Sequence, residues 1–268
     1  MNNQSIKIII ASFLLIFAMQ VGAQETITIP LSKPSEPGLL KIAINSGNIT
    51  VKGYSGKEVI VKASSRKSNY RGQSSKKGLK RIAVNTLEFR AEENDNYVIV
   101  DTKYYQAIDF EVQVPKNFSL ALKTVNDGKI YVENVNGIME ISNMNGPITL
   151  KDISGSVSAD ALNQDIKVSF VEVKPNTPMA FSSLNGDIDI TFPKSLKADV
   201  KMKSERGELF TDFDIKMKPS KAEYTNTSGK NGKAYQVKVE KWIIGSINGG
   251  GPEFFFKNYN GDVIIRSK

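Results

Sequence analysis

The sequence predicts an all-β chain: a single-stranded β-helix, or solenoid, built from turn-and-strand repeats. Three observations predict it: a recurring Asn-Gly dipeptide, an alternating apolar run after each copy, and quasi-regular spacing between copies. The clearest copies occupy residues 126–132, 136–141, 145–150, 185–190 and 260–265, with an earlier one at 45–51. Asn and Gly tolerate positive φ, and alternation is typical of half-buried strands, so each copy predicts a turn followed by a strand.

The spacing predicts how the repeats assemble. Gly128, Gly137, Gly146 and Gly155 are nine residues apart, and later copies are 19 to 21 residues apart. The unit is therefore a half-coil of about nine residues or a full coil of about twenty, and a single coil cannot bury its apolar face without neighbours. The residues expected to point inward are Ile130, Val132, Ile148, Leu150, Ile166, Val168, Ile188 and Ile190.

Less regular elements flank the repeats. Apolar runs predict early strands at 26–29, 39–44, 48–51, 57–63, 82–89, 97–102 and 110–114, with an acidic turn at 91–96. Residues 195–203 alternate strictly, which predicts a strand with Leu196, Ala198, Val200 and Met202 inward. Later come an insertion at 216–232, a long strand at 234–244 and a strand at 253–257, and the last rung ends at Ile265.

Residues 1–23 have the pattern of a secretory signal peptide. Lys7 precedes an apolar run at 8–19, and Val21-Gly22-Ala23 supplies the small residues of a cleavage site. An uncleaved N-terminal anchor is the alternative. There is no cysteine, which excludes a lipid-anchored lipoprotein. The prediction is one exported domain at 24–268, with regular repeats at about 119–268, no later transmembrane segment, and a location in the periplasm or at the surface of a bacterium.

Positive charge gathers in one segment of the chain. The formal net charge is +8, or +7 without Lys7, and residues 64–81 carry no acidic side chain. The candidate binding residues are Arg66, Lys67, Arg71, Lys76, Lys77, Lys80 and Arg81. One interpretation is a site for polyanions, and the other is a solvated loop between two strands. Tyr70 is its only aromatic residue, so the base-stacking pattern of nucleic-acid binding is missing.

The Asn-Gly rungs at 126–132, 136–141, 145–150, 185–190 and 260–265 resemble the bacterial putative adhesin family of domains of unknown function. They also resemble the related head GIN domain of envelope proteins, and the stretch at 78–82 resembles envelope members of the first family. The resemblance covers about residues 39–268, and the chain departs from its regular pattern at 51–118 and 216–247. It implies a single-stranded β-helix exported to the envelope or surface, and it brings no catalytic residues.

The residue types restrict the chemistry. The chain has no histidine and no cysteine, which excludes Ser-His and Cys-His catalysis and imidazole zinc sites. We expect no catalytic residue, no metal and no cofactor. A polysaccharide-processing enzyme is the alternative, in which Asp187 and Asp189 would converge beside Lys167 or Glu208. In the other interpretation Asp187 belongs to a turn and Asp189 is a solvated rung. A weak calcium site is a further alternative, at Glu92, Glu93 and Asp95 in the acidic turn.

Two further features allow two interpretations each. The turn asparagines could form a ladder displayed to glycans, but we favour local backbone hydrogen bonds. Phe254, Phe255 and Phe256 could form a platform for a partner or glycan, but we favour a cap packed on the last coil. Trp242, the only tryptophan, is expected in the core.

The sequence therefore predicts a non-enzymatic envelope protein, a binding or scaffold module for anionic or carbohydrate surfaces. The expected partners are envelope polysaccharide, lipid headgroups or a surface protein. Nucleic acid is not expected. Two alternatives remain from other classes: a polysaccharide-processing enzyme on the same scaffold, and an envelope-stress sensor that works through a protein partner.

Overall fold

The computed structural model describes residues 24–66, 87–103, 106–220, 223–228 and 235–268. Every regular element in these ranges is a β-strand, which confirms the all-β prediction. Within the same ranges, no helix has the length and apolar character needed to cross a membrane. The predicted signal peptide at 1–23 lies outside the described residues and stays a prediction.

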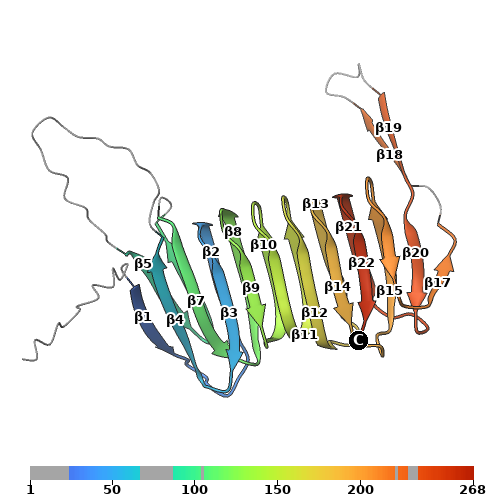
Figure 1. Ribbon diagram of the computed structural model, residues 1–268. Coiled ribbons are helices and arrows are strands. Elements are labelled where there is room, and N and C mark those ends of the chain that lie inside the picture. Colours follow the sequence, from blue (N-terminus) through green and yellow to red (C-terminus); the bar gives the residue numbers. More distant parts are fainter. Residues whose placement is uncertain (1–23, 67–86, 104–105, 221–222, 229–234) are drawn as a thin grey trace, which may run out of the picture.

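The strands form two faces of an elongated stack (Figure 1). Face A contains, in spatial order, β5 (Phe89–Asn94), β6 (Tyr97–Thr102), β2 (Gly38–Ser46), β8 (Phe118–Asn126), β10 (Asn136–Asn143), the second half of β11 (Ile148–Ala161), β13 (Met179–Asn185), β21 (Glu253–Asn260), β15 (Ala198–Ser204), β20 (Ile243–Ile247) and β17 (Ile215–Lys218). Face B contains β1 (Gln24–Pro30), β4 (Glu58–Ser65), β7 (Ile108–Pro115), β3 (Ile49–Tyr54), β9 (Ile130–Glu133), the first half of β11, β12 (Ile166–Val173), β14 (Ile188–Phe192), β22 (Val263–Ser267) and β16 (Leu209–Thr211).

Most neighbouring strands in the middle of the stack are parallel and in register. One coil is a face A strand, a turn and a face B strand, so equivalent residues lie above one another. The residues predicted to point inward are all buried, including Leu196, Ala198, Val200 and Met202 of the strand around β15. Aromatic rings continue this alignment, because Phe170 stacks on Phe192 at 4.9 Å between ring centroids. The core is therefore one continuous apolar column between the two faces.

The coils do not follow one another in sequence order. The rung that ends at Ile265 is the last in the sequence, but it does not lie at the end of the stack. The β2–β3 coil lies between the β6–β7 and β8–β9 coils. The C-terminal β21–β22 coil lies between the β13–β14 and β15–β16 coils (Figure 1). Local alternation predicts which residues are buried, but several coils offer the same apolar pattern, so it does not select a strand's neighbour.

The turns between the faces differ in which residue adopts a positive φ. Gly186 and Gly261 have φ near 130°, as expected for glycine after asparagine in a tight turn. At 126–128 the left-handed residue is instead Asp127, with φ 49°, and Gly128 is needed for space. A Cβ on Gly128 would lie 1.9 Å from the carbonyl oxygen of Gly47 in the next coil.

Three local predictions need correction. The acidic stretch 91–96 is mainly strand, because β5 pairs with β6 as far as Asn94 and only Asp95 and Asn96 turn. The predicted strand at 234–244 is interrupted between β19 (Tyr235–Glu240) and β20. The insertion at 216–232 contains β17 and β18 (Glu223–Ser228), and β18 pairs with β19 in a separate hairpin that projects from the stack (Figure 1). Of the strand at 82–89, residues 82–86 lie outside the described residues.

The inserted C-terminal coil gives a test of the core. Phe256 is fully buried and stacks on Phe181 at 5.3 Å between ring centroids. We expect Phe256→Ala to lower the free energy of unfolding by about 3–5 kcal/mol, because it leaves a cavity in a continuous core. Phe210→Ala is the control, since that ring is 46% exposed. Urea unfolding of both variants measures the difference, and equal losses would contradict a structural role for the inserted coil.

Candidate functional site

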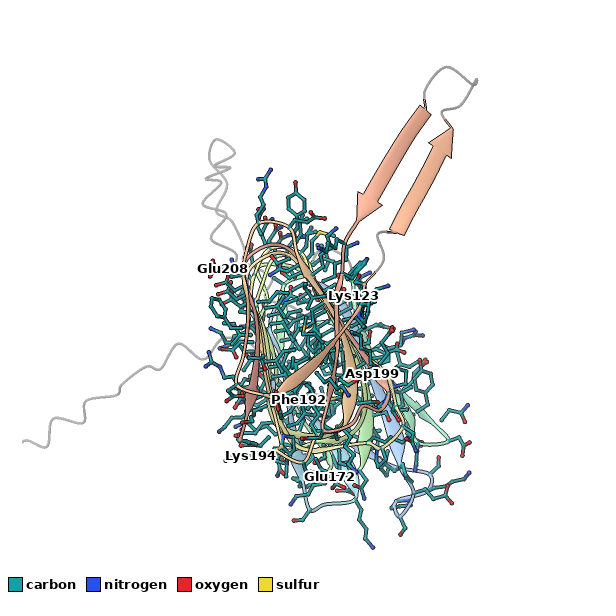
Figure 2. All side chains as sticks on the ribbon, turned by 90° about the vertical axis from the view of Figure 1, so that its right-hand side faces the viewer. Lys123, Glu172, Phe192, Lys194, Asp199 and Glu208 are labelled. Atoms are coloured by element: carbon teal, nitrogen blue, oxygen red, sulfur yellow. The ribbon has the colours of Figure 1, made fainter. Side chains whose placement is uncertain are left out.

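The stack has two edges where the chain passes between its faces. The asparagine edge contains the turns from a face A strand to the next face B strand, and the groove edge contains the turns back. In the view along the stack, Glu208 lies at the asparagine edge and Glu172 and Lys194 lie at the groove edge (Figure 2). Lys123 and Asp199 lie on face A. Each candidate residue can therefore be placed on an edge or a face.

The asparagine edge contains a ladder of side-chain amides. The Nδ2 atoms donate to the Oδ1 atoms of the preceding coil, at 2.7–3.3 Å, in the order Asn126, Asn145, Asn163, Asn185 and Asn260. The ladder includes the inserted C-terminal coil, so it follows spatial order and not sequence order. The favoured interpretation, local backbone hydrogen bonds, therefore needs correction, because these asparagines mainly bond one another between coils.

A second, buried set of polar side chains supports the same turns. Asn143 donates from Nδ2 to the carbonyl oxygen of Gly128 at 2.9 Å, and its Oδ1 accepts the N–H of Gly146. Asn258 donates in the same way to the carbonyl oxygens of Gly186 and Asp262. Both asparagines are 1% exposed, so their side-chain amides must find hydrogen-bond partners within the protein, and the turn carbonyls supply them.

Asp187 belongs to a third ladder and has a structural contact. Its Oδ1 accepts the backbone N–H of Asp262 at 2.8 Å. Asp165 accepts the N–H of Asp187 in the same way, and Asp262 accepts the N–H of Glu208. Each carboxylate thus holds the turn of the next coil, which agrees with the interpretation of Asp187 as a turn residue.

Asp189 lies on the outer surface of face B and is bound by a different partner. Arg266 donates to both of its carboxylate oxygens, at 2.8 and 3.2 Å. Lys167 lies beside Asp189 on the neighbouring strand, as proposed, but its Nζ forms an ion pair with Asp165 at 3.3 Å. Asp187, Asp189 and Lys167 of the enzyme alternative therefore each have a partner outside that set.

The acidic residues suggested for calcium are also separated by their contacts. Glu92 pairs with Arg90, and Asp95 pairs with Lys33 at 2.7 Å. Glu93 accepts the N–H groups of Ser32 and Asn96, and these bonds hold the pKa of its carboxyl below the ordinary value. In the described part of the chain, no group of three or more acidic side chains is arranged to hold a metal ion.

Of the predicted cation cluster, only Arg66 lies within the described residues. Its guanidinium group forms an ion pair with Asp109 at 2.9 Å and donates to the carbonyl oxygen of Asp127. This places Arg66 at the asparagine edge, next to the ladder. Arg66 is therefore a structural contact at the start of the basic segment. Lys67, Arg71, Lys76, Lys77, Lys80 and Arg81 lie outside the described residues.

The three consecutive phenylalanines divide as their alternation requires. Phe254 and Phe256 are buried in the core, and Phe255 points outward from face A. Trp242 covers Phe255, with ring centroids 5.1 Å apart, and Lys201 lies 4.8 Å from the tryptophan ring. Trp242 is buried as predicted, but it packs on the outer surface of face A and not in the core column.

These features define the class of protein: a parallel β-solenoid whose coils are joined by polar ladders. The chain belongs to the Toastrack DUF4097 family, whose sequence model matches residues 4–241. This confirms the resemblance to an adhesin-type family of unknown function that the Asn-Gly rungs indicated. The match ends before β20, so the inserted β21–β22 coil lies outside it. No curated protein matched the chain.

Three solved structures were also found. A putative cell adhesion protein from Clostridium sporogenes ATCC 15579 is 12% identical, with 92% of this chain and 99% of that chain covered and a TM-score of 0.43. A putative adhesin from Bacteroides fragilis NCTC 9343 is 11% identical, with 92% and 97% covered and a TM-score of 0.31. A putative adhesin from Parabacteroides merdae ATCC 43184 is 10% identical, with the same coverage and a TM-score of 0.28.

The buried amides can be tested against the exposed ones. We expect Asn258→Ala to lower the free energy of unfolding by about 1–3 kcal/mol, since it removes a buried amide and leaves the carbonyl oxygen of Gly186 without the side-chain donor of Asn258. Asn126→Ala removes the exposed end of the amide ladder and should cost much less. Thermal and urea unfolding of the two variants gives the comparison. A larger loss for Asn126→Ala would contradict the structural role of the buried set.

Asp199 gives a pH-dependent test at the C-terminal end of the stack. Its Oδ1 accepts from Lys218 Nζ at 2.8 Å and from the hydroxyl of Ser246, and these contacts hold its pKa below the ordinary value of 3.8. A carboxyl with a depressed pKa stabilises the fold above its unfolded pKa, and the contribution is lost as the pH falls through the folded pKa. We expect Lys218→Met to raise the pKa of Asp199 and weaken acid resistance. Lys216→Met is the control, and NMR titration of both variants measures the pKa of Asp199. An unchanged pKa of Asp199 in Lys218→Met would contradict the ion pair.

Proposed function

We propose that the chain is a non-enzymatic binding or scaffold module, exported to the bacterial cell envelope, that attaches to anionic or carbohydrate surfaces. A stack of coils joined by amide and carboxylate ladders gives a rigid support. The carboxylates that an enzyme would need are used in contacts between coils: Asp187 holds a backbone N–H and Asp189 holds Arg266. This favours a binding role over the polysaccharide-processing alternative.

The observation that carries the proposal is the fixed attachment of the basic segment. Arg66 is held by Asp109 and Asp127 at the asparagine edge, and Leu87 at the other end packs against the core. Between them the sequence carries six further cations and no acidic residue: Lys67, Arg71, Lys76, Lys77, Lys80 and Arg81. A dense positive segment on a rigid body attracts polyanions through a field that salt screens.

The test is co-sedimentation of residues 24–268 with an acidic polysaccharide and with vesicles of anionic phospholipid, at low and high salt. We expect binding at low salt that high salt abolishes. Charge reversal of Lys76, Lys77, Lys80 and Arg81 should weaken it by about tenfold or more, because the attraction is electrostatic. Arg66 is left unchanged, since its ion pair is structural.

The matched control reverses four exposed lysines elsewhere: Lys41, Lys57, Lys123 and Lys194. It changes the net charge by the same amount, so it separates a local site from a general charge effect. Equal losses in the two variants, or no binding at low salt, would contradict the role of the basic segment.

A further inference from the structure

The groove edge contains two neighbouring hollows that none of the ladders fills. They have volumes of about 430 and 420 Å³, within the range of ligand-binding clefts. Glu172, Lys174 and Pro175 line both, so the hollows adjoin on either side of the loop at 174–178. That loop is longer than the turn between β9 and β10, which is only two residues. The two hollows therefore lie where the longer loop at 174–178 interrupts the regular repeat.

The two hollows together follow the long axis of the stack. Side chains from successive coils line the first: Ser119 from β8, Asn136 and Ile138 from β10, and Ser154 from β11. The second continues with Val171 from β12 and Ser195 and Lys197 from the loop after β14. Neighbouring strands are about 4.8 Å apart, so several coils give a track long enough for an extended polymer.

The walls of the track are held in place. Asn136 donates to Oδ1 of Asn117 at 3.0 Å, and Ser119 Oγ accepts the N–H of Ile138 at 3.2 Å. On the far side, Asn248 donates to the carbonyl oxygens of Lys194 and Leu196 at 2.9 and 2.8 Å. A preformed track loses little conformational entropy when it binds a ligand.

The chemistry of the lining is mostly neutral. Amides and hydroxyls alternate with aliphatic side chains, of which Ile138 is 50% and Val171 is 57% exposed. Glu172 and Lys174 border both hollows and carry opposite charges, and Lys197 borders the second hollow. Side-chain amides and hydroxyls both donate and accept, so they match a ligand rich in hydroxyl groups, while the aliphatic groups can cover its C–H faces.

A peptide fits the track less well. Recognition by strand addition needs an open sheet edge. Here β8 pairs with β2 and β10, β10 pairs with β8 and β11, and β11 pairs with β10 and β13. In this described part of the stack, the strands beneath the first hollow therefore have no free edge to offer an extended backbone.

We propose that the groove edge binds an uncharged glycan chain laid along the stack, with one subsite on each side of the loop at 174–178. This deepens the proposed function and rests on it, but it uses a different surface and a different interaction from the basic segment. Binding here depends on hydrogen bonds and apolar contacts, so it is insensitive to salt, unlike attachment through the basic segment.

The test measures binding of residues 24–268 to neutral glucan, mannan and chitin oligosaccharides of increasing length by calorimetry, at low and high salt. We expect at least one series to bind more tightly as the chain lengthens, with equal affinity at both salt concentrations. Glu172→Ala combined with Lys174→Ala should weaken that binding by about tenfold, or 1.4 kcal/mol. Ser195→Trp should block the second subsite and remove the gain from longer chains.

Matched controls lie on the outer surface of face A. Glu140→Ala combined with Lys123→Ala removes the same charges, and Ser158→Trp adds the same bulk at an exposed serine. Neither should change the affinity, and thermal unfolding checks that all variants are folded. Charge reversal in the basic segment should also leave neutral-glycan binding unchanged.

Three outcomes would overturn the proposal. The first is no binding of any neutral series, and the second is equal binding by the groove and control variants. The third is binding of an extended uncharged peptide at this edge in place of the glycans. None of these affects salt-sensitive attachment to acidic polymers, so failure of the groove proposal is distinguishable from failure of the proposed function.

Discussion

The in-register stacking of parallel coils is the constraint on which the rest of the structure depends. It places each residue above the equivalent residue of the neighbouring coil, so side chains of one kind form a column along the stack. Inside, the columns are apolar, as with Ile130, Ile148 and Ile166. At the asparagine edge the same rule places polar turn groups above one another, within hydrogen-bond distance of the next coil, and the buried Asn143 and Asn258 find their partners there because water does not reach them. The amide and carboxylate ladders are the result.

The inserted coils extend this constraint to residues distant in sequence. Asn260 donates to Asn185, and Asp262 donates its N–H to Asp187, across 75 residues. The last coil therefore cannot be added to a finished stack, because β15–β16 is joined to the coils before it only through β21–β22. Contacts of such high sequence separation are costly in loop entropy and slow to form. Folding of the C-terminal third must wait for the end of the chain.

The sequence could predict the strands and buried residues because alternation is a local property. It could not predict the order of the coils, since Val263 and Leu209 both suit the column above Ile188. Trp242 was misplaced for a related reason: hydrophobicity predicts burial but does not distinguish the core from a cover over Phe255. The sequence favoured local backbone hydrogen bonds over an amide ladder because an Asn-Gly turn already explains its asparagine locally. The track at the groove edge has no motif, and only the assembled stack brings its lining residues together.

A regular ladder also restricts where binding can arise. At most rungs the polar groups of the edge are used by neighbouring coils, as Asp187 and Asn258 illustrate. Surface chemistry available to a ligand must then come from places where the repeat is interrupted. Two such places are the basic segment that follows Arg66 and the loop at 174–178 that separates the two hollows. The first carries only positive charge, and the second combines hydroxyls, amides and aliphatic groups with charges of both signs. The two proposals therefore assign an anionic surface and an uncharged chain to separate parts of one stack.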